Sequence, residues 1–319
     1  MKIQNQKPIF SSYQKTTIIK QPLIKTLQIL PLPKNYILLL NSNSTITIYT
    51  PIFYNLLLTI PNTIHFNQIN KVTLLKNGKI ITSSSDKTLN LISINYSLPK
   101  YNILQCLIGH SLDVWMCLEL SDKNLASSSN DNTIIIWYFN KEEDLYEKLL
   151  ILNTNPDIIV NFIETNNKIL ICSSFFNYNY HIQFWDIENY EKIGIIDNII
   201  ISRINNLIQF NNDIICVNGS ENFEGLQFIN ISNMEIIKKN FLNLNITSFY
   251  ILKDGSFLIG DMENENYGNL RLYNINNDNL EFEEVCFKEK CHSYPILDIV
   301  QLENGDVITV SNEIIIWRK

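Results

Sequence analysis

The chain has 319 residues, of which 45% are hydrophobic, 11% aromatic and 18% charged. This composition provides enough apolar surface for a sizeable core and excludes a disordered chain. The formal net charge of −7 and the presence of only three arginines (Arg203, Arg271 and Arg318) provide no basic face for phosphate groups, so neither nucleic acid nor an anionic membrane is an expected partner.

The N-terminal segment and the cysteines indicate the cellular compartment. Residues 1–14 lack the apolar core of a secretion signal, and the most apolar stretch, residues 36–60, is interrupted by asparagines and a proline. None of the six cysteines belongs to a CxxC pair, so we expect reduced thiols. The sequence therefore predicts a cytoplasmic protein, with a nuclear location also open, that is neither secreted nor membrane-spanning.

Short β-prone runs recur along the whole chain at nearly constant spacing. In chain order they are TITIY, LNLI, IIIW, IQFW, LQFI, LRLY and a second IIIW, and they end at residues 49, 92, 137, 185, 229, 273 and 317. The successive intervals between these ends are 43, 45, 48, 44, 44 and 44 residues. Seven similar units therefore fill residues 1–319, which we interpret as one domain.

Each unit contains further strand-like runs around its terminal run. In the second unit, VTLL, the turn NG, KIITSSS and the turn SDK lead to LNLI, and an apolar run such as YEKLLIL follows most units. Four short antiparallel strands per repeat, without an amphipathic helix, are typical of a propeller blade and exclude a helical solenoid. The predicted fold is all-β, a seven-bladed propeller of four-stranded antiparallel blades.

The third unit, LIGHSLDVWMCLELSDKNLASSSNDNTIIIW, resembles the repeat of the WD-repeat (WD40) family. Its Gly109-His110 pair, its Ser127 and Asp131, and its terminal Trp137 match the family signature. The second unit aligns with it at an offset of 45 residues, whereas the seventh keeps a partial set and the first, fifth and sixth are degenerate. The resemblance implies a buried hydrogen-bond network in these units, made of His110, Ser127, Asp131 and Trp137; His65, Thr82 and Asp86; and His292, Thr309 and Trp317.

The last unit lacks sequence for a fourth strand, because the chain ends two residues after Trp317. Residues 16–19 align with residues 105–108, the fourth-strand run that precedes the complete third unit. The WD-repeat resemblance implies that an N-terminal strand completes the final blade, and such pairing removes an exposed sheet edge. We therefore predict that residues 16–19 form the closing strand.

The histidine, hydroxyl and carboxylate of the third unit also supply the groups of a catalytic triad. Their recurrence in other units favours a structural role, because a catalytic site normally occurs once. A C-x4-C-H run at Cys286, Cys291 and His292 lacks a fourth metal ligand, and no Gly-rich phosphate loop, HExxH or GxSxG is present. We therefore expect no catalytic residue, cofactor, metal site or small-molecule substrate.

The resemblance places partner binding on the face formed by the loops between blades and by the second-to-third-strand turns. The positions aligned with Trp115 near the start of each first strand are Thr26, Asn70, Val160, Asn205, Thr247 and Leu297. Trp115 has two interpretations, a binding anchor or a side chain that only packs at the channel mouth. The candidate partner-binding residues are Trp115, Asp113, Arg203, Asn130, Asn70 and Ser85.

Three functions remain open at this point. The first is a non-catalytic scaffold or adaptor that binds other proteins or peptides within a multiprotein complex. The second is a substrate receptor of a ubiquitin ligase, although the Trp-Asp-x-Arg docking sequence of some relatives is missing, since Ile187-Glu188 follows Trp185-Asp186. The third, a propeller enzyme with an acid and a base at the channel mouth, finds only Asp113 as a rim carboxylate.

Overall fold

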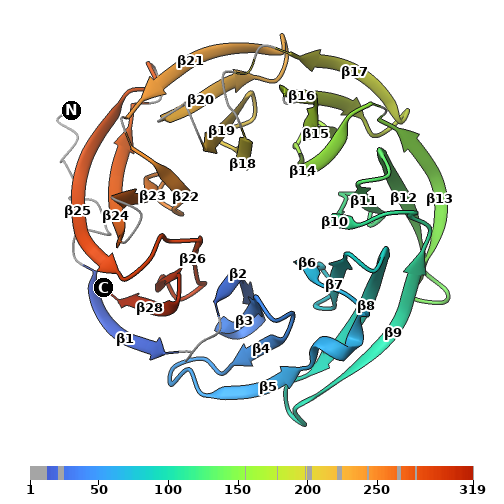
Figure 1. Cartoon of the computed structure of the whole chain (residues 1–319), viewed down its shortest axis with the longest axis horizontal. Helices are drawn as coiled ribbons and strands as arrows, with labels where there is room; N and C mark the ends of the chain where they lie inside the picture. Colours follow the sequence, from blue (N-terminus) through green and yellow to red (C-terminus); the bar gives the residue numbers. More distant parts are fainter. Residues whose placement is uncertain are drawn as a thin grey trace, which may run out of the picture.

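Seven four-stranded antiparallel sheets form a ring in the computed structural model of the chain (Figure 1). The predicted fold class is therefore confirmed. The structure describes residues 13–20, 25–154, 156–177, 179–197, 199, 203–220, 225–242, 244–263, 267–276 and 279–318, without the side chains of residues 17, 18, 20, 203–205, 219, 220, 240, 241 and 263.

Each blade runs from an innermost strand, a, to an outermost strand, d. Blade 1 comprises β2 (Thr26–Leu32), β3 (Tyr36–Asn41), β4 (Ile46–Tyr49) and β5 (Leu56–Ile60). Blade 2 comprises β6 (Ile69–Leu74), β7 (Ile80–Ser84), β8 (Thr88–Asn95) and β9 (Lys100–Ile108). Blade 3 comprises β10 (Val114–Glu119), β11 (Leu125–Ser129), β12 (Thr133–Asn140) and β13 (Leu145–Asn153). Blade 4 comprises β14 (Ile158–Glu164), β15 (Ile169–Phe176), β16 (Asn179–Asp186) and β17 (Glu191–Ile196).

The remaining blades follow the same order around the ring. Blade 5 comprises β18 (Arg203–Gln209), β19 (Ile214–Ser220), β20 (Gly225–Asn230) and β21 (Glu235–Phe241). Blade 6 comprises β22 (Ile246–Ile251), β23 (Phe257–Glu263), β24 (Tyr267–Ile275) and β25 (Phe282–His292). Blade 7 comprises β26 (Asp298–Gln301), β27 (Val307–Val310), β28 (Glu313–Arg318) and β1 (Gln14–Lys20).

The antiparallel course of each blade gives the ring two different faces. The d–a connections between blades and the b–c turns lie at one end of the strands, which we call the upper face. The a–b and c–d turns lie at the other end, the lower face. The only helical segments among the described residues are two short 3-10 turns, η2 (Pro33–Asn35) and η3 (Asn62–Ile64), and none is long and apolar enough to cross a membrane.

The regular spacing of the units corresponds to one fixed place in each blade. Residues 49, 92, 137, 185, 229, 273 and 317 all lie on strand c where the adjoining strand d inserts one extra residue. Strand c continues beyond this place by one to three residues in all blades except the first. The extra, bulged residues are Leu57, Leu104, Leu149, Ile193, Ile237, Val285 and Thr16.

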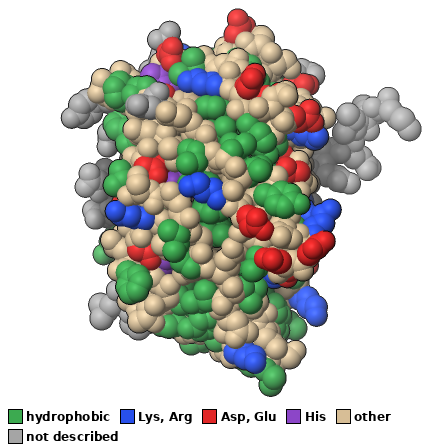
Figure 2. Space-filling view, turned by 90° about the vertical axis from the view of Figure 1, so that its right-hand side faces the viewer, with side chains coloured by type: hydrophobic (Ala, Val, Ile, Leu, Met, Phe, Trp, Pro, Cys, Tyr) green, Lys and Arg blue, Asp and Glu red, His purple; other side chains and the backbone are tan. Residues whose placement is uncertain are grey.

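The outer wall of the ring carries apolar side chains among charged ones. Four of the bulged residues, Leu104, Leu149, Ile193 and Ile237, are exposed on consecutive blades. Figure 2 views the side of the ring that includes β13, where hydrophobic side chains lie between lysines and acidic residues. A bulge bends a sheet edge and interrupts its hydrogen-bonding groups, so the wall offers no flat strand for edge-to-edge pairing.

The ring is closed by the N-terminal strand. β1 pairs antiparallel with β28, from Gln14 opposite Arg318 to Lys20 opposite Glu313, and Figure 1 shows the two strands together. Tyr13 precedes this strand, is buried and donates its hydroxyl to the carbonyl of Gly305 at 2.5 Å. β1 spans seven residues and so extends beyond the predicted residues 16–19 at both ends.

Neighbouring blades are also linked at the lower ends of their inner strands. The backbone N–H of Lys76 donates to Glu119 Oε2 of the next blade at 2.5 Å, and that of Ser121 donates to Glu164 Oε2 at 2.6 Å. Glu119 and Glu164 are the last residues of β10 and β14. At both interfaces, therefore, the a–b turn of one blade contacts the end of strand a of the next blade. These bonds supplement the apolar contacts that fill the space between the sheets.

Candidate functional site

The network predicted in the third unit connects four segments of blade 3. His110, on the connection between β9 and β10, places Nδ1 at 3.0 Å from Asp131 Oδ2 and Nε2 at 2.8 Å from Ser127 Oγ. The Trp137 indole N–H donates to the same Ser127 oxygen at 2.8 Å. Because Ser127 accepts from Trp137, its hydroxyl can donate to His110 Nε2, which leaves the Nδ1 proton for Asp131.

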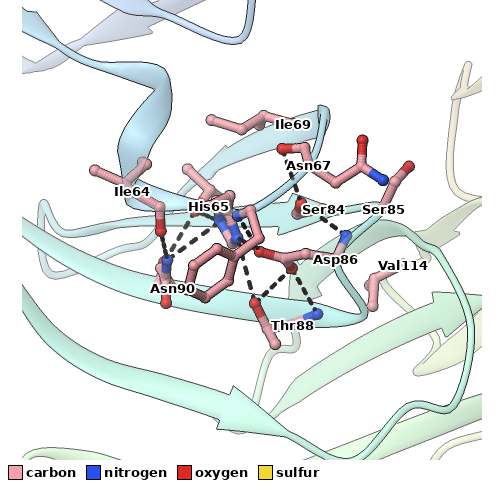
Figure 3. Close-up of polar contacts among 12 residues, drawn as sticks. Ile64, His65, Asn67, Ile69, Ser84, Ser85, Asp86, Thr88, Asn90 and Val114 are labelled. Carbon is pink, nitrogen blue, oxygen red and sulfur yellow. Dashed lines mark hydrogen bonds and ion pairs between the residues drawn. The ribbon is translucent and has the colours of Figure 1, made fainter.

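Blade 2 repeats this arrangement with one replacement (Figure 3). His65 Nδ1 lies 2.8 Å from Asp86 Oδ2, and Nε2 lies 2.7 Å from Thr82 Oγ1. Ile92 stands where the tryptophan would be, and the Asn90 side chain donates to the carbonyl of Ile64 at 2.6 Å instead. The upper connection is therefore still tied to strand c.

Blade 4 contains a literal Trp-Asp pair, but the aspartate is outside the network. Asp186 caps the c–d turn by accepting from the Glu188 N–H at 2.8 Å. The Trp185 N–H donates to Gln183 Oε1 at 3.1 Å, and Gln183 donates to Asp157 Oδ2 at 2.5 Å. The repeat signature contains a hydroxyl on strand b and an aspartate in the b–c turn, so it does not reveal this substitute network of Trp185, Gln183 and Asp157.

The burial of these groups limits what they can do chemically. The hydroxyl-bearing residues Ser127, Thr82 and Thr309 each have 0% exposure, so a substrate cannot reach them in this conformation. Burial alone would raise the pKa of Asp131, but hydrogen bonds from His110, Thr133 and the Ser111 N–H hold this pKa well below its usual range. The carboxylate therefore remains charged as an acceptor, as expected for a fully satisfied buried network.

In blade 7 the network is incomplete because the b–c turn supplies no aspartate. His292 Nε2 lies 2.6 Å from Thr309 Oγ1, and the Trp317 N–H donates to Thr309 at 2.9 Å. His292 Nδ1 has no hydrogen-bond partner among the described residues, and its nearest acidic oxygen there, Glu313 Oε1, is 3.8 Å away. Burial lowers the pKa of His292 from its ordinary 6.5 to about 3.

The low pKa of His292 predicts a specific loss of stability in mild acid. His292 is protonated near pH 6.5 in the unfolded state but only near pH 3 in the folded state. The free energy of unfolding that this difference provides is fully present above pH 6.5 and is lost as the pH falls toward 3. The His292 contribution should fall by about 2 kcal/mol between pH 7 and pH 5. Urea unfolding of the wild type and of His292→Gln, whose side-chain amide can both donate to and accept from Thr309, should show that decline only in the wild type. Parallel pH curves for the two proteins would contradict it.

A bulge near the start of the innermost strand is the second feature that recurs from blade to blade. Strand a of the first six blades carries a one-residue bulge near its upper end, and Leu297 occupies the corresponding place in blade 7. In blade 1 this residue is Leu27, one position after the predicted Thr26, which is buried instead. We call the six bulged residues and Leu297 the rim: Leu27, Asn70, Trp115, Val160, Asn205, Thr247 and Leu297.

Trp115 is the largest side chain of the rim and is held by its neighbours. It is half-buried, and its indole N–H donates to Asn130 Oδ1 at 2.7 Å. The backbone N–H of Asn130 in turn donates to the carbonyl of Asp113 at 3.0 Å. The b–c turn and the d–a connection of blade 3 therefore hold the Trp115 indole in one orientation.

The other candidate residues surround Trp115 or lie beyond it along the rim. Asn70 donates to the carbonyl of Val114 at 2.8 Å and to Ser85 Oγ at 3.1 Å, so the rims of blades 2 and 3 are joined. Asp113 is the one acidic side chain in this group of candidates. The backbone of Arg203 begins β18, but its side chain and that of Asn205 lie outside the described residues.

The cysteines form no metal centre in the part of the chain that the structure describes, where no group of three or more His, Cys, Asp or Glu residues could hold a metal ion. All six thiols are free, and burial raises the pKa of Cys291 to about 12. The Cys291 thiol instead contacts the Gly268 carbonyl at 3.4 Å.

Comparison with known proteins agrees with the geometry of the blades. Residues 101–138, from β9 to β12, match the family model described as WD domain, G-beta repeat. The chain is similar in fold to the WD40 β-propeller domain of Doa1, with a TM-score of 0.71, 14% identity, and coverage of 97% of this chain and 98% of that chain. It is also similar to a chain of the mitotic checkpoint complex, with a TM-score of 0.76, 11% identity, and coverage of 96% and 94%. No curated protein matches the sequence.

Proposed function

We propose that this chain, a WD40-type β-propeller whose residues 101–138 match the WD-repeat family, is a non-catalytic scaffold or adaptor that binds proteins or peptides at the rim. The observation that carries this proposal is the arrangement of Trp115, which a bulge of β10 places near the upper end of the strand and Asn130 fixes in orientation. Bulges often re-aim side chains beside functional sites. Tryptophan is among the residues that contribute most to binding energy at protein interfaces.

The chemistry of the rim supports a protein or peptide partner. Asn70 of the rim, with its neighbour Ser85, and Asn130 beside Trp115 provide amide and hydroxyl groups that can pair with a peptide backbone, and Trp115 provides apolar area. The buried hydroxyls of the blade networks support a non-catalytic role. Because all six cysteines are free thiols, we expect the protein to act in the cytoplasm or nucleus.

A ubiquitin-ligase receptor is the second candidate function, and the structure gives it less support. Asp186 is followed by Ile187 and Glu188, and Asp186 is engaged in its own turn rather than free for docking. A protein that binds phosphorylated segments would need several arginines near the rim, and Arg203, two positions before Asn205, is the only candidate in the sequence.

Photo-cross-linking tests the location of the binding face. The photoreactive amino acid p-benzoylphenylalanine would replace Trp115 in one variant and Tyr138, which is 49% exposed near the end of the same blade's strand c, in a control. After irradiation in the cells that express the protein, we expect protein adducts at position 115 that are absent at position 138. The same adducts at both positions, or none at position 115, would contradict the proposal.

A further inference from the structure

The c–d turn of blade 1 projects two large apolar side chains from the lower face. Ile52 is 68% exposed and Phe53 is 78% exposed, and Leu56, which begins β5, is 57% exposed. The corresponding turn residues of three other blades are polar: Glu142 and Glu143, Glu188 and Asn189, and Ser232 and Asn233. We call Ile52, Phe53 and Leu56 the apolar tip.

The backbone of the apolar tip is strained in a way that these three turns are not. Tyr54, Asp144, Tyr190 and Met234 close their turns with φ between 52° and 58°, but Ile52 adds a second positive φ of 70° in blade 1. The Phe53 N–H donates to the Pro51 carbonyl at 2.8 Å, which with this φ corresponds to a rare, strained form of γ-turn. A β-branched residue is especially unfavourable there, and asparagine, abundant in this chain, would be tolerated better.

Contacts with blade 7 hold the apolar tip in place. Tyr54 is 5% exposed and donates its hydroxyl to Asp306 Oδ2 at 2.9 Å, and burial raises the pKa of Tyr54 to about 12. Arg318 donates to the Ile52 carbonyl at 3.0 Å and to Asp306 at 3.2 Å, with its guanidinium 5.5 Å from the centre of the Tyr54 ring. The two exposed side chains therefore project from a fixed backbone.

The neighbouring blade extends the apolar surface. Leu98 occupies the position of Phe53 in the c–d turn of blade 2 and is 67% exposed. The ring of Tyr96, in the same turn, packs against Tyr36 of blade 1 with 4.7 Å between the ring centres. The c–d turns of two neighbouring blades thus carry exposed apolar residues on the lower face, and the turn of blade 2 packs against the start of β3 of blade 1.

From this arrangement we infer that the apolar tip is a second docking site, which inserts Ile52 and Phe53 into an apolar pocket of a folded protein. A pre-organised pair of large side chains loses little entropy on insertion, and strain retained at one exposed position points to a function. A lipid surface is the less favoured occupant, because Arg318 is already paired with Asp306 and the chain carries a net charge of −7. Trp115 lies toward the upper face and the apolar tip lies on the lower face. A ring with both sites bridges two proteins, which goes beyond the proposed binding at the rim.

The test places p-benzoylphenylalanine at position 53 and, as a control, at position 66 of the full-length protein. Phe66 is an exposed phenylalanine on the connection between blades 1 and 2, on the upper face. After irradiation in the native cells, the adduct at position 53 is identified by mass spectrometry, and that protein is purified for affinity measurements. We expect Phe53→Ser to weaken its binding at least tenfold and Phe66→Ser and Trp115→Ala to leave it unchanged.

A variant that relieves the strain separates docking from folding. Ile52→Asn should melt at or above the temperature of the wild type, because asparagine accepts a positive φ, while binding of the same protein falls at least tenfold. Adducts only with lipid, only with a second copy of the chain, or none at position 53 would overturn the inference, as would unchanged affinity of Phe53→Ser. If only Trp115→Ala weakened binding of the cross-linked protein, that protein would bind at the rim, and the inference of a second site would be wrong. The absence of a protein adduct at position 53 would not affect the proposal that the rim binds a partner.

Discussion

Removal of residues 1–20 should abolish the single cooperative unfolding transition of the ring. The deletion removes β1, leaves β28 as an open edge and takes away Tyr13, which packs in one cluster with Trp317 and Ile315. Each lost backbone hydrogen bond contributes about 0.5–1.5 kcal/mol, so the loss of a whole strand approaches the total stability of an ordinary domain, about 5–15 kcal/mol. Calorimetry should show a broadened transition at much lower temperature, together with aggregation through the open edge.

A rearranged chain provides the matched control for this deletion. Gln14 lies opposite Arg318, so residues 13–20 attached after residue 319 through a short flexible linker could return along β28 as a hairpin. We expect this variant to recover the cooperative transition, because it restores the strand without the original N-terminal connection. A truncated protein that melts like the wild type would show that the ring does not depend on β1.

Replacement of Trp137 by alanine should produce the largest loss of stability among single substitutions in blade 3, about 3–5 kcal/mol. Trp137 is 2% exposed and packs so closely over Gly109 that a Cβ there would lie 3.0 Å from the indole ring. The substitution leaves a cavity beside Gly109 and removes the hydrogen bond to Ser127. Urea unfolding followed by tryptophan fluorescence and circular dichroism measures the change.

His110→Ala is the comparison within the same network. It removes less apolar volume but leaves Asp131 and Ser127 without the histidine as a partner, so we expect a smaller loss of about 1–3 kcal/mol. If Trp137→Ala costs less than His110→Ala, polar pairing rather than packing dominates the stability of this blade.

The fold could be predicted because one structural constraint recurs in every unit. The outer bulge fixes the same place on strand c in each blade, so the terminal residues remain nearly 44 positions apart even where Ile92 or Ile229 replaces the tryptophan. The missing fourth strand of the last unit likewise indicated an N-terminal strand. Periodicity carries this information without requiring a complete signature in each unit.

The sites were harder to predict because they depend on side-chain contacts between segments. The Asp157–Gln183–Trp185 chain uses residue types that the repeat signature does not contain. The bulged position of blade 1 is Leu27 and not the aligned Thr26, because Thr26 is paired with Asn41 in the ladder and is buried. Nothing in the sequence distinguishes exposed Phe53 from the buried phenylalanines, since exposure depends on how the turn is anchored to blade 7.

The most direct test of the central claim compares partner recovery by the wild type and by Trp115→Ala, with Tyr138→Ala as the control. Quantitative mass spectrometry after affinity capture gives the partners, and melting curves verify that all three proteins are folded. The rim proposal predicts that a discrete set of proteins is lost with Trp115→Ala and retained with Tyr138→Ala, at unchanged melting temperature. If Trp115→Ala retains every partner of the wild type, the binding face lies elsewhere on the ring.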